Sequence, residues 1–322
     1  MDNLKKVGLT ALAGSLAAVS AHAAEMTVSG ATVLTYTSED GTEVTGNPYG
    51  MKTNIGFTAS GDVNGMTVSY MQTSKDQFAG MSSARLSIDM GDMGTLAFDQ
   101  GSGSGLATID DKTPTAAEEI WDGLDGVTTG GLVGAAGNTG VFNYVNTIAG
   151  VTLNAAARKG SGAANSDGSS SGAGGSAMDF ALTGTGDMIG VDGLSWGAGY
   201  GESDPGEQLN TAGEPTDDEH FTGFINYSMG PMTVGYQESH IAGGTVGANN
   251  ETTQAWGIAL AVNENLSVSY GEREVEYSKA SSAHVTEDGE GLAVAYTMGS
   301  MKIAGNVNEV SNNDGTANSM TK

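Results

Sequence analysis

The chain of 322 residues has no cysteine, only five prolines, and 12 basic residues against 38 acidic ones, so its formal net charge at pH 7 is −26. The absence of cysteine excludes a disulfide framework and any zinc or iron–sulfur site held by thiolates. The shortage of lysine and arginine excludes nucleic acid as a partner, because phosphate binding needs clustered basic side chains. The sequence after the N-terminus also lacks an apolar run long enough for a transmembrane helix.

Histidine is scarce too, and its four copies, at positions 22, 220, 240 and 284, are not spaced as metal ligands. The sequence shows no serine–histidine–aspartate order and no carboxylate pair that can be placed face to face for acid–base chemistry. It therefore predicts a protein that is not an enzyme, with no catalytic residue, no metal site and no cofactor.

Residues 1–23 have the features of a secretory signal peptide. Two lysines precede a short apolar stretch at 7–19, and residues 21–23 read Ala-His-Ala, a pattern typical of a cleavage site. We expect cleavage after this triplet and export of the mature chain, 24–322, across an inner membrane. The lack of cysteine suits an oxidising compartment, where stray thiols are a hazard.

Apolar and polar residues alternate with a period of two along most of the mature chain, which is the pattern of a strand with two different faces. Helical periodicity is nearly absent. The alternation predicts about fifteen strands, at 26–37, 52–60, 65–74, 82–90, 93–100, 140–148, 150–158, 177–184, 194–202, 220–229, 231–240, 253–262, 265–276, 291–298 and 300–310.

The connections between these strands alternate between short and long. The short set includes 62–64 and 263–264, and the long set includes 101–139 and 203–219. Hairpins with one tight end and one loose end predict an up-and-down meander, as in transmembrane barrels, whose strands of about 9–11 residues cross the bilayer at a tilt. A soluble sandwich has no such bias, and a solenoid would repeat at a fixed short period.

The charges indicate which face of the strands meets water. All five basic residues of the predicted strands share the parity of Ser, Thr, Asn and Gly: Lys52, Arg85, Arg158, Arg273 and Lys302. Unpaired charge is costly in a packed core, so this parity predicts a wet lumen with lipid on the opposite face. The apolar parity carries aromatic residues that suit interfacial girdles, with ordinary core aromatics as the alternative: Tyr36, Tyr70, Tyr144, Trp196, Tyr227, Trp256 and Tyr296. We expect the glycines at tight turns and at small lumen-facing positions.

Four stretches resemble the general porins of Gram-negative bacteria. Residues 87–100, Ser-Ile-Asp-Met-Gly-Asp-Met-Gly-Thr-Leu-Ala-Phe-Asp-Gln, resemble the glycine–threonine turn and strand that precede the constriction loop of that family. Residues 142–152 are similar to the hairpin that follows the loop, 26–30 to the first strand, and 256–272 to a later hairpin.

The resemblance implies an all-β fold, a transmembrane antiparallel β-barrel of sixteen strands that is usually trimeric and serves passive diffusion. It also implies a C-terminal aromatic residue used in outer-membrane assembly, where this chain has a lysine. Residues 311–322 show no alternation, so we expect that the sequence is truncated at its C-terminus and lacks the last strand. The alternative is a miscount within 185–219.

The long segment 101–139 stands where the family's third extracellular loop folds into the barrel and narrows it. Thr113 is a suitable helix cap and Pro114 suits the first helical position, so a short helix is expected to run to Trp121. The segment is rich in carboxylates, of which four are predicted to line the constriction: Asp110, Asp111, Glu118 and Glu119.

In the family, loop acids oppose bases on the barrel wall. The matching wall positions are Lys52 and Arg85, whereas the sixth strand offers only Asn143 and Asn146. This incomplete set of bases predicts a preference for cations. We expect Arg158, Arg273 and Lys302 to be further lumen-facing bases. A solvated loop with incidental charge is the alternative.

The sequence thus predicts a porin in the outer membrane of a Gram-negative bacterium, a water-filled channel for passive diffusion of small hydrophilic solutes and ions. Its expected partners are outer-membrane lipid, lipopolysaccharide and two further copies of the chain in a homotrimer. One alternative is a secreted or surface-attached acidic adhesin with calcium-binding loops, and another is a barrel enzyme. The acids at 217–219 and 287–288 are expected in long loops, either solvated or binding divalent cations that bridge to lipopolysaccharide phosphates.

Overall fold

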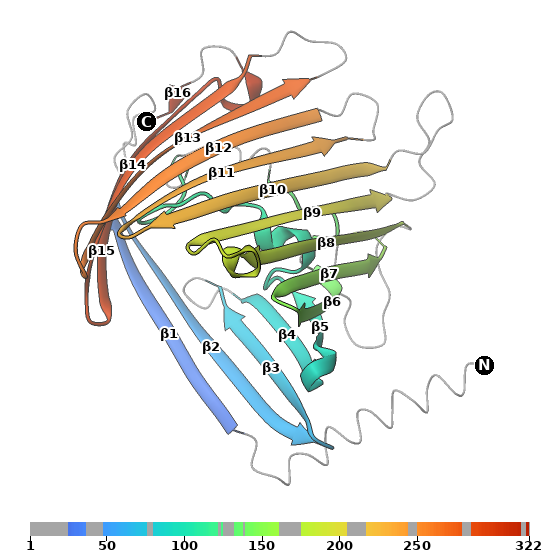
Figure 1. Ribbon diagram of the computed structural model, residues 1–322. Coiled ribbons are helices and arrows are strands. Elements are labelled where there is room, and N and C mark those ends of the chain that lie inside the picture. The colour runs from blue at the N-terminus through green and yellow to red at the C-terminus, as the bar shows by residue number, and fades with distance from the viewer. Residues whose placement is uncertain are drawn as a thin grey trace.

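A computed structural model describes residues 25–36, 48–75, 80–121, 124, 132–137, 139–160, 175–204, 217–243, 250–278, 285–316 and 320–321. The predicted signal peptide lies outside the described residues. Figure 1 shows one strongly curved sheet, with the chain that follows β5 running along its concave side.

Sixteen strands form this sheet in strict chain order, and each pairs antiparallel with its neighbours. The strands are β1 (Glu25–Tyr36), β2 (Tyr49–Val63), β3 (Met66–Ser74), β4 (Met81–Asp89), β5 (Thr95–Gln100), β6 (Thr139–Ile148), β7 (Val151–Lys159), β8 (Ser176–Thr185), β9 (Leu194–Asp204), β10 (Asp218–Met229), β11 (Met232–Ala242), β12 (Asn250–Ala261), β13 (Leu266–Ser278), β14 (Glu287–Met298), β15 (Met301–Ser311) and β16 (Met320–Thr321). The predicted all-β meander is confirmed.

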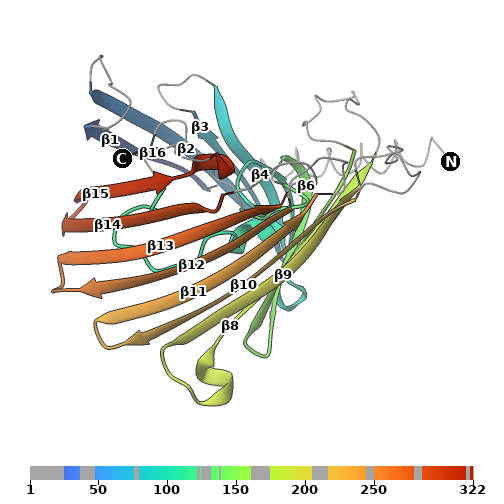
Figure 2. The ribbon, with the colours of Figure 1, turned by 90° about the horizontal axis from the view of Figure 1, so that it is seen from above.

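The sixteenth strand, which we expected to be missing, is present among the described residues as the two-residue β16. Its residues pair with Val310 and Ser311 at the end of β15. Among the described residues β1 pairs only with β2, so the sheet stays open between β1 and the last strands (Figure 2).

In the described part of the chain, four short 3₁₀ helices accompany the strands: η2 (Gly91–Met93), η3 (Gly105–Ile109), η4 (Gly186–Ile189) and η5 (Asn313–Gly315). No helix in the described part of the chain is long and apolar enough to cross a membrane.

Tight turns close the sheet at one end. The link between β2 and β3 is Asn64-Gly65, and both residues have positive φ, at 54° and 80°. Ala149-Gly150 repeats this geometry between β6 and β7. Positive φ at both central residues gives a turn whose twist matches that of the flanking strands. The short links therefore sit at one end of the sheet, and the long connections at the other, as predicted.

The two faces of the sheet are inverted relative to a soluble protein. Large apolar side chains of one parity are exposed, for example Val307 at 76% and Leu34 at 74%. The opposite parity buries polar groups, among them Asp99, Asn143 and Gln237. A sheet that turns its apolar face outward and its polar face inward fits lipid outside and water inside.

The register places the five bases of the predicted strands on the inward face, whereas Lys159, the last residue of β7, has the opposite parity. On β2, Lys52 has the same parity as Thr58. Thr58 pairs with Met71 of β3, and Met71 pairs with Arg85 of β4, so Lys52 and Arg85 share one face. Arg273 lies between Ala255 and Gly289, on the face opposite to Trp256. In this pairing the five predicted bases share one face of the sheet.

The prediction that the acids at 217–219 and 287–288 lie in long loops is wrong for four of the five. Asp218 and Glu219 begin β10, and Glu287 and Asp288 begin β14. Glu287 is buried, because its carboxylate pairs with Arg273 inside the sheet.

Candidate functional site

Residues 101–121, here called the inner segment, cross the concave face from the end of β5 toward β15, and residues 132–137, the return segment, come back beside β8 and β9 (Figure 1). Together they cover part of 101–139, the predicted constriction loop. The polar side chains of the strands hold both segments through hydrogen bonds to their backbone.

The inner segment begins at a buried carboxylate on β5. Asp99 is fully buried, and its Oδ2 lies 3.3 Å from the Arg85 guanidinium and accepts a hydrogen bond of 2.7 Å from the Ser104 hydroxyl. Arg85 also donates to the carbonyl of Gly103. Arg85, predicted to face the loop acids across the pore, thus pairs with an acid of the neighbouring strand and holds the first turn of the segment.

η3 is the apolar anchor of the inner segment. Leu106 and Ile109 are buried and cluster with Val133 of the return segment and Ala181 of β8. Burying such side chains stabilises the arrangement by roughly 1.5–3 kcal/mol each. The helix therefore fixes the segment against the wall instead of leaving it in the lumen.

A single carboxylate on β8 binds both segments. Asp179 accepts a hydrogen bond of 3.0 Å from Leu106 N through Oδ1 and one of 2.8 Å from Ala136 N through Oδ2. Asn143 and Asn154 add acceptors for Gly105 N, at 3.2 and 2.9 Å. Asn143, which replaces an expected wall base, is thus an anchor for the loop backbone.

The predicted constriction acids Asp110 and Asp111 lie after η3, where Gln237 of β11 binds the backbone. The Gln237 amide donates 2.9 Å hydrogen bonds to the carbonyls of Ile109 and Asp110. Burial raises the pKa of the Asp110 carboxyl above its ordinary value. Burial, with the nearby Asp110 charge, also raises the pKa of Asp111, whose Oδ1 lies 3.8 Å from the Lys112 ammonium.

The predicted helix from Thr113 to Trp121 does not form. The barrel wall supplies the partners that a helix would have taken: Ser269 on β13 accepts a 2.8 Å hydrogen bond from Ala116 N, and Asn308 on β15 donates to the carbonyl of Glu119 at 3.3 Å. Residues 113–121 instead form bends and turns, and the sheet binds two of their backbone groups. The helix prediction considered the capping residues alone and not the hydrogen bonds that the sheet makes to the segment.

Glu118 and Glu119, the other two predicted constriction acids, lie on the same stretch. The Glu118 side chain is exposed and that of Glu119 is half-buried. The structure therefore places all four predicted loop acids along one segment on the concave side of the sheet.

Arg273 lies beneath the end of the inner segment and is only 4% exposed. Its guanidinium packs 4.7 Å from the centre of the Trp121 ring and 3.5 Å from the Glu287 carboxylate, which also accepts a hydrogen bond from Tyr277. The expected lumen-facing base is on the expected face, but its charge is covered.

The remaining predicted bases differ in exposure. Lys52 on β2 is exposed, and no carboxylate in the described part of the chain forms an ion pair with it. Lys302 is exposed near the short-link end of β15, and Arg158 on β7 is half-buried. Of the two predicted wall bases, Arg85 is paired with Asp99, whereas Lys52 has an exposed charge that forms no ion pair among the described residues.

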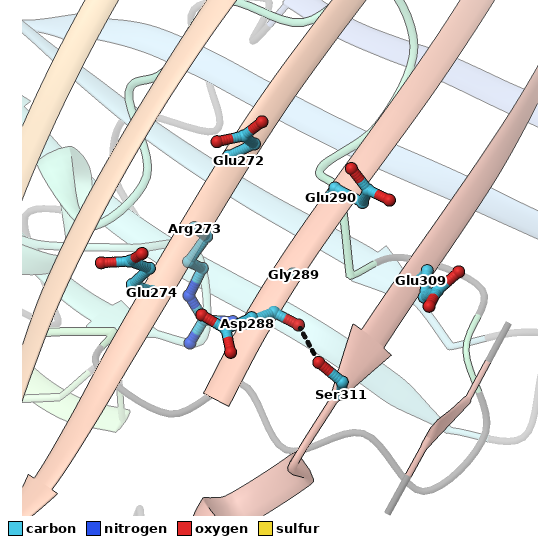
Figure 3. Close-up of a pocket in the computed structure, with 8 residues that line it drawn as sticks. All are labelled: Glu272, Arg273, Glu274, Asp288, Gly289, Glu290, Glu309 and Ser311. Atoms are coloured by element: carbon cyan, nitrogen blue, oxygen red, sulfur yellow. Dashed lines mark hydrogen bonds between the residues drawn. The ribbon is translucent and has the colours of Figure 1, made fainter. Parts of the chain in front are cut away.

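An unpredicted acidic group lies outside the sheet at its long-connection end (Figure 3). Glu272, Glu290 and Glu309 stand opposite one another on β13, β14 and β15. The Tyr270 hydroxyl oxygen lies 2.8 Å from a carboxylate oxygen of Glu272 and 2.8 Å from one of Glu290, and its single proton is donated to one of them at a time. A sequence signal existed, because the pattern Tyr-x-Glu recurs at 200–202, 236–238 and 270–272 with both side chains on one face.

The residues that hold the inner segment were also missed as functional residues. They are polar side chains on the inward parity, where water alone was expected to satisfy them: Asp99, Asp179, Asn226, Gln237, Ser269 and Asn308. The sequence signal that could have identified these residues was an acid on the inward parity with no basic residue nearby in the sequence.

No protein-family model matches the sequence, and no curated protein matches it either. Solved structures do. OmpF of Salmonella typhi, solved with daunomycin, covers 92% of this chain and 95% of its own at 12% identity, with a TM-score of 0.62. OmpT, an outer membrane protein of Vibrio cholerae, covers 92% and 90% at 14% identity with a TM-score of 0.59, and a trimer form of OmpT also matches. The outer membrane channel DcaP of Acinetobacter baumannii covers 92% and 93% at 14% identity, with a TM-score of 0.57.

These similarities extend over most of both chains. The protein therefore has the fold of Gram-negative outer-membrane porins, which confirms the fold that the sequence motifs implied. At this level of identity the comparison shows the fold alone.

Proposed function

We propose that this protein is an outer-membrane porin, a water-filled channel through which small hydrophilic solutes and ions diffuse passively. The observation that carries the proposal is the inner segment, which crosses the polar concave face of a sheet whose apolar face is exposed. A sheet with that polarity needs lipid on its outside, and a strand-anchored segment inside it narrows the aqueous path. The porin fold of the structural neighbours supports the same function.

The channel prefers cations in this proposal. Asp110, Asp111, Glu118 and Glu119 supply negative charge from the inner segment, while Lys52 is the exposed base of the opposite wall. Arg85 adds little field at the pore, because its charge is paired with that of Asp99. Selectivity follows from the charges that line the narrowest part of a pore.

The proposal includes a homotrimer in the outer membrane of a Gram-negative bacterium, in contact with lipid and lipopolysaccharide, after export and removal of residues 1–23. The trimer form of OmpT supports the assembly state. Mass determination of the detergent-extracted protein, by light scattering for the complex and by mass spectrometry for the chain, tests both points. A monomeric mass, or a chain that retains residues 1–23, would contradict them.

The central test is single-channel recording in a planar bilayer. The purified protein is expected to give discrete conductance steps, and a potassium chloride gradient is expected to give a reversal potential of the sign for cation preference. A protein that inserts into liposomes as a β-rich species and yet conducts no ions would refute the channel. Conduction with a reversal potential of zero or of anionic sign would refute the preference alone.

A further inference from the structure

Four glycines form a continuous row across the inward face of four adjacent strands. Gly235 of β11 stands opposite Gly257 of β12, Gly257 opposite Gly271 of β13, and Gly271 opposite Gly291 of β14. Glycine weakens a strand, because it has no side chain to pack and loses more backbone freedom on folding than other residues. Four aligned copies therefore call for a compensating contact.

An asparagine continues the row at each end. Asn226 of β10 stands opposite Gly235, and Asn308 of β15 stands opposite Gly291. Asn226 Nδ2 donates a 2.8 Å hydrogen bond to the carbonyl of Lys112, and Asn308 Nδ2 donates one of 3.3 Å to that of Glu119. The two asparagines pin the inner segment at both ends of the stretch that crosses the glycines.

The segment lies directly on the glycine row. A Cβ atom on Gly257 would stand 2.7 Å from the carbonyl oxygen of Pro114, and one on Gly291 would stand 2.9 Å from Cβ of Ile120. A Cβ on Gly235 would overlap both Asn226 Oδ1 and the Pro114 ring, and one on Gly271 would stand 3.0 Å from the carbonyl oxygen of Trp256 and 3.4 Å from Ile120 Cγ2. Nonbonded carbon and oxygen atoms do not approach as closely as the first two distances, so the backbone of the segment would have to move away from the wall.

We infer that this glycine row, Gly235, Gly257, Gly271 and Gly291, sets the height of the inner segment above the barrel wall and thereby the bore of the pore. The inference rests on the proposed channel function. The glycines are positioning residues, because they touch the segment and not the solute. Each methyl group added to the row moves the acidic segment further into the aqueous path.

The test compares Gly257→Ala with Gly305→Ala, both in planar bilayers and in liposome swelling with sugars of increasing size. Gly305 is a glycine of β15 around which an added Cβ would meet no atom within 4 Å, so it controls for the cost of the substitution in a strand. Gly257→Ala is expected to lower single-channel conductance and to exclude the larger sugars. Gly305→Ala is expected to match the wild type.

A second pair of variants covers the case in which Gly257→Ala fails to fold. Gly235→Ala is expected to lower conductance as well. Addition of Pro114→Ala removes the ring carbons of the inner segment but leaves Asn226 Oδ1 in place, so it is expected to recover only part of the loss. A purely structural role would reduce the yield of folded protein but not the conductance of the channels that insert.

The outcomes separate the two proposals. A wild-type protein without conductance steps sinks the channel function and the inference with it. A conducting wild type whose folded Gly257→Ala and Gly235→Ala variants conduct as well as the wild type, or better, leaves the channel standing and overturns the role of the glycine row.

Discussion

The guanidinium of Arg273 on β13 lies 4.7 Å from the ring centre of Trp121, so a buried base of the barrel wall supports an aromatic side chain of the inner segment. A cation held over an aromatic ring is attracted by the negative face of the ring, by about 2 kcal/mol when the pair is desolvated. The same guanidinium neutralises the buried carboxylate of Glu287. The Arg273 side chain therefore supports the inner segment and also balances a buried negative charge of the wall.

Replacing Arg273 by methionine should destabilise the folded protein strongly. The change leaves Glu287 buried without its cationic partner, a situation that costs about 3–5 kcal/mol. Urea unfolding in liposomes, followed by tryptophan fluorescence, measures the loss. Addition of Glu287→Gln should restore part of it, and Lys302→Met, at an exposed base of the same sheet face, should change the free energy of unfolding by less than about 0.5 kcal/mol. Equal stability of Arg273→Met and the wild type would contradict the assigned role.

Replacing Asp179 by asparagine should loosen the inner and return segments together. The amide keeps one acceptor oxygen but turns a donor toward one of the two backbone N–H groups, Leu106 N or Ala136 N. Hydrogen bonds to a charged group contribute about 1.5–3 kcal/mol each. We expect more open-channel noise and faster cleavage of the loop by added protease. Asp187→Asn, at η4 on the short-link end, is the matched control and should be silent.

Neutralising Glu118 and Glu119 together should reduce the preference for cations over anions. Both carboxylates lie on the inner segment, where the field at the narrow part of the pore is expected to act on passing ions. The measurement is the reversal potential in a potassium chloride gradient, which should shift toward zero in Glu118→Gln/Glu119→Gln. Asp92→Asn/Asp187→Asn, in η2 and η4 at the short-link end of the sheet, removes the same number of charges and controls for net charge. A reversal potential that moves equally in both variants would show that the position of the two glutamates is unimportant.

Cation preference should also fall in acid, and it should do so above the ordinary aspartate range. Burial raises the pKa of Asp110, and burial with the charge of Asp110 raises that of Asp111, so these carboxyls take up protons above about pH 3.9. The folded state binds those protons more readily than the unfolded chain does, so the two groups oppose folding at neutral pH and cease to do so as the pH falls through their raised pKa values.

The reversal potential recorded as a function of pH tests this. The wild type should lose cation preference in steps that Asp110→Asn/Asp111→Asn does not show. A titration that is unchanged by removing both carboxyls would assign the pH dependence to other acids of the pore.

Several features of the fold and site could be predicted from the sequence because they depend on local pattern. A period of two defines strands and their faces, since successive side chains of a strand point to opposite sides. Arg273 shares the parity of Ser267 and Ser269 in its own strand, which predicted a polar face for it, and short links such as 62–64 identified the tight end. Residues 101–139 stood out by their length alone.

The path of that long segment was decided by the tertiary structure. Thr113 and Pro114 favour a helix locally, but Ser269 and Asn308, more than 150 residues further along the chain, bind the backbone of Ala116 and Glu119, and the stretch runs in bends and turns. The tertiary structure also decided that Arg85 pairs with Asp99 and that Trp121 covers Arg273.

The sequence by itself determined that this chain forms an up-and-down sheet with one apolar and one polar face, because alternation is a property of neighbouring residues. Only the tertiary structure decided which polar groups meet water and which hold the loop, because partners such as Asn226 and Lys112, or Gly291 and Ile120, are brought together by strand order and register across the whole barrel.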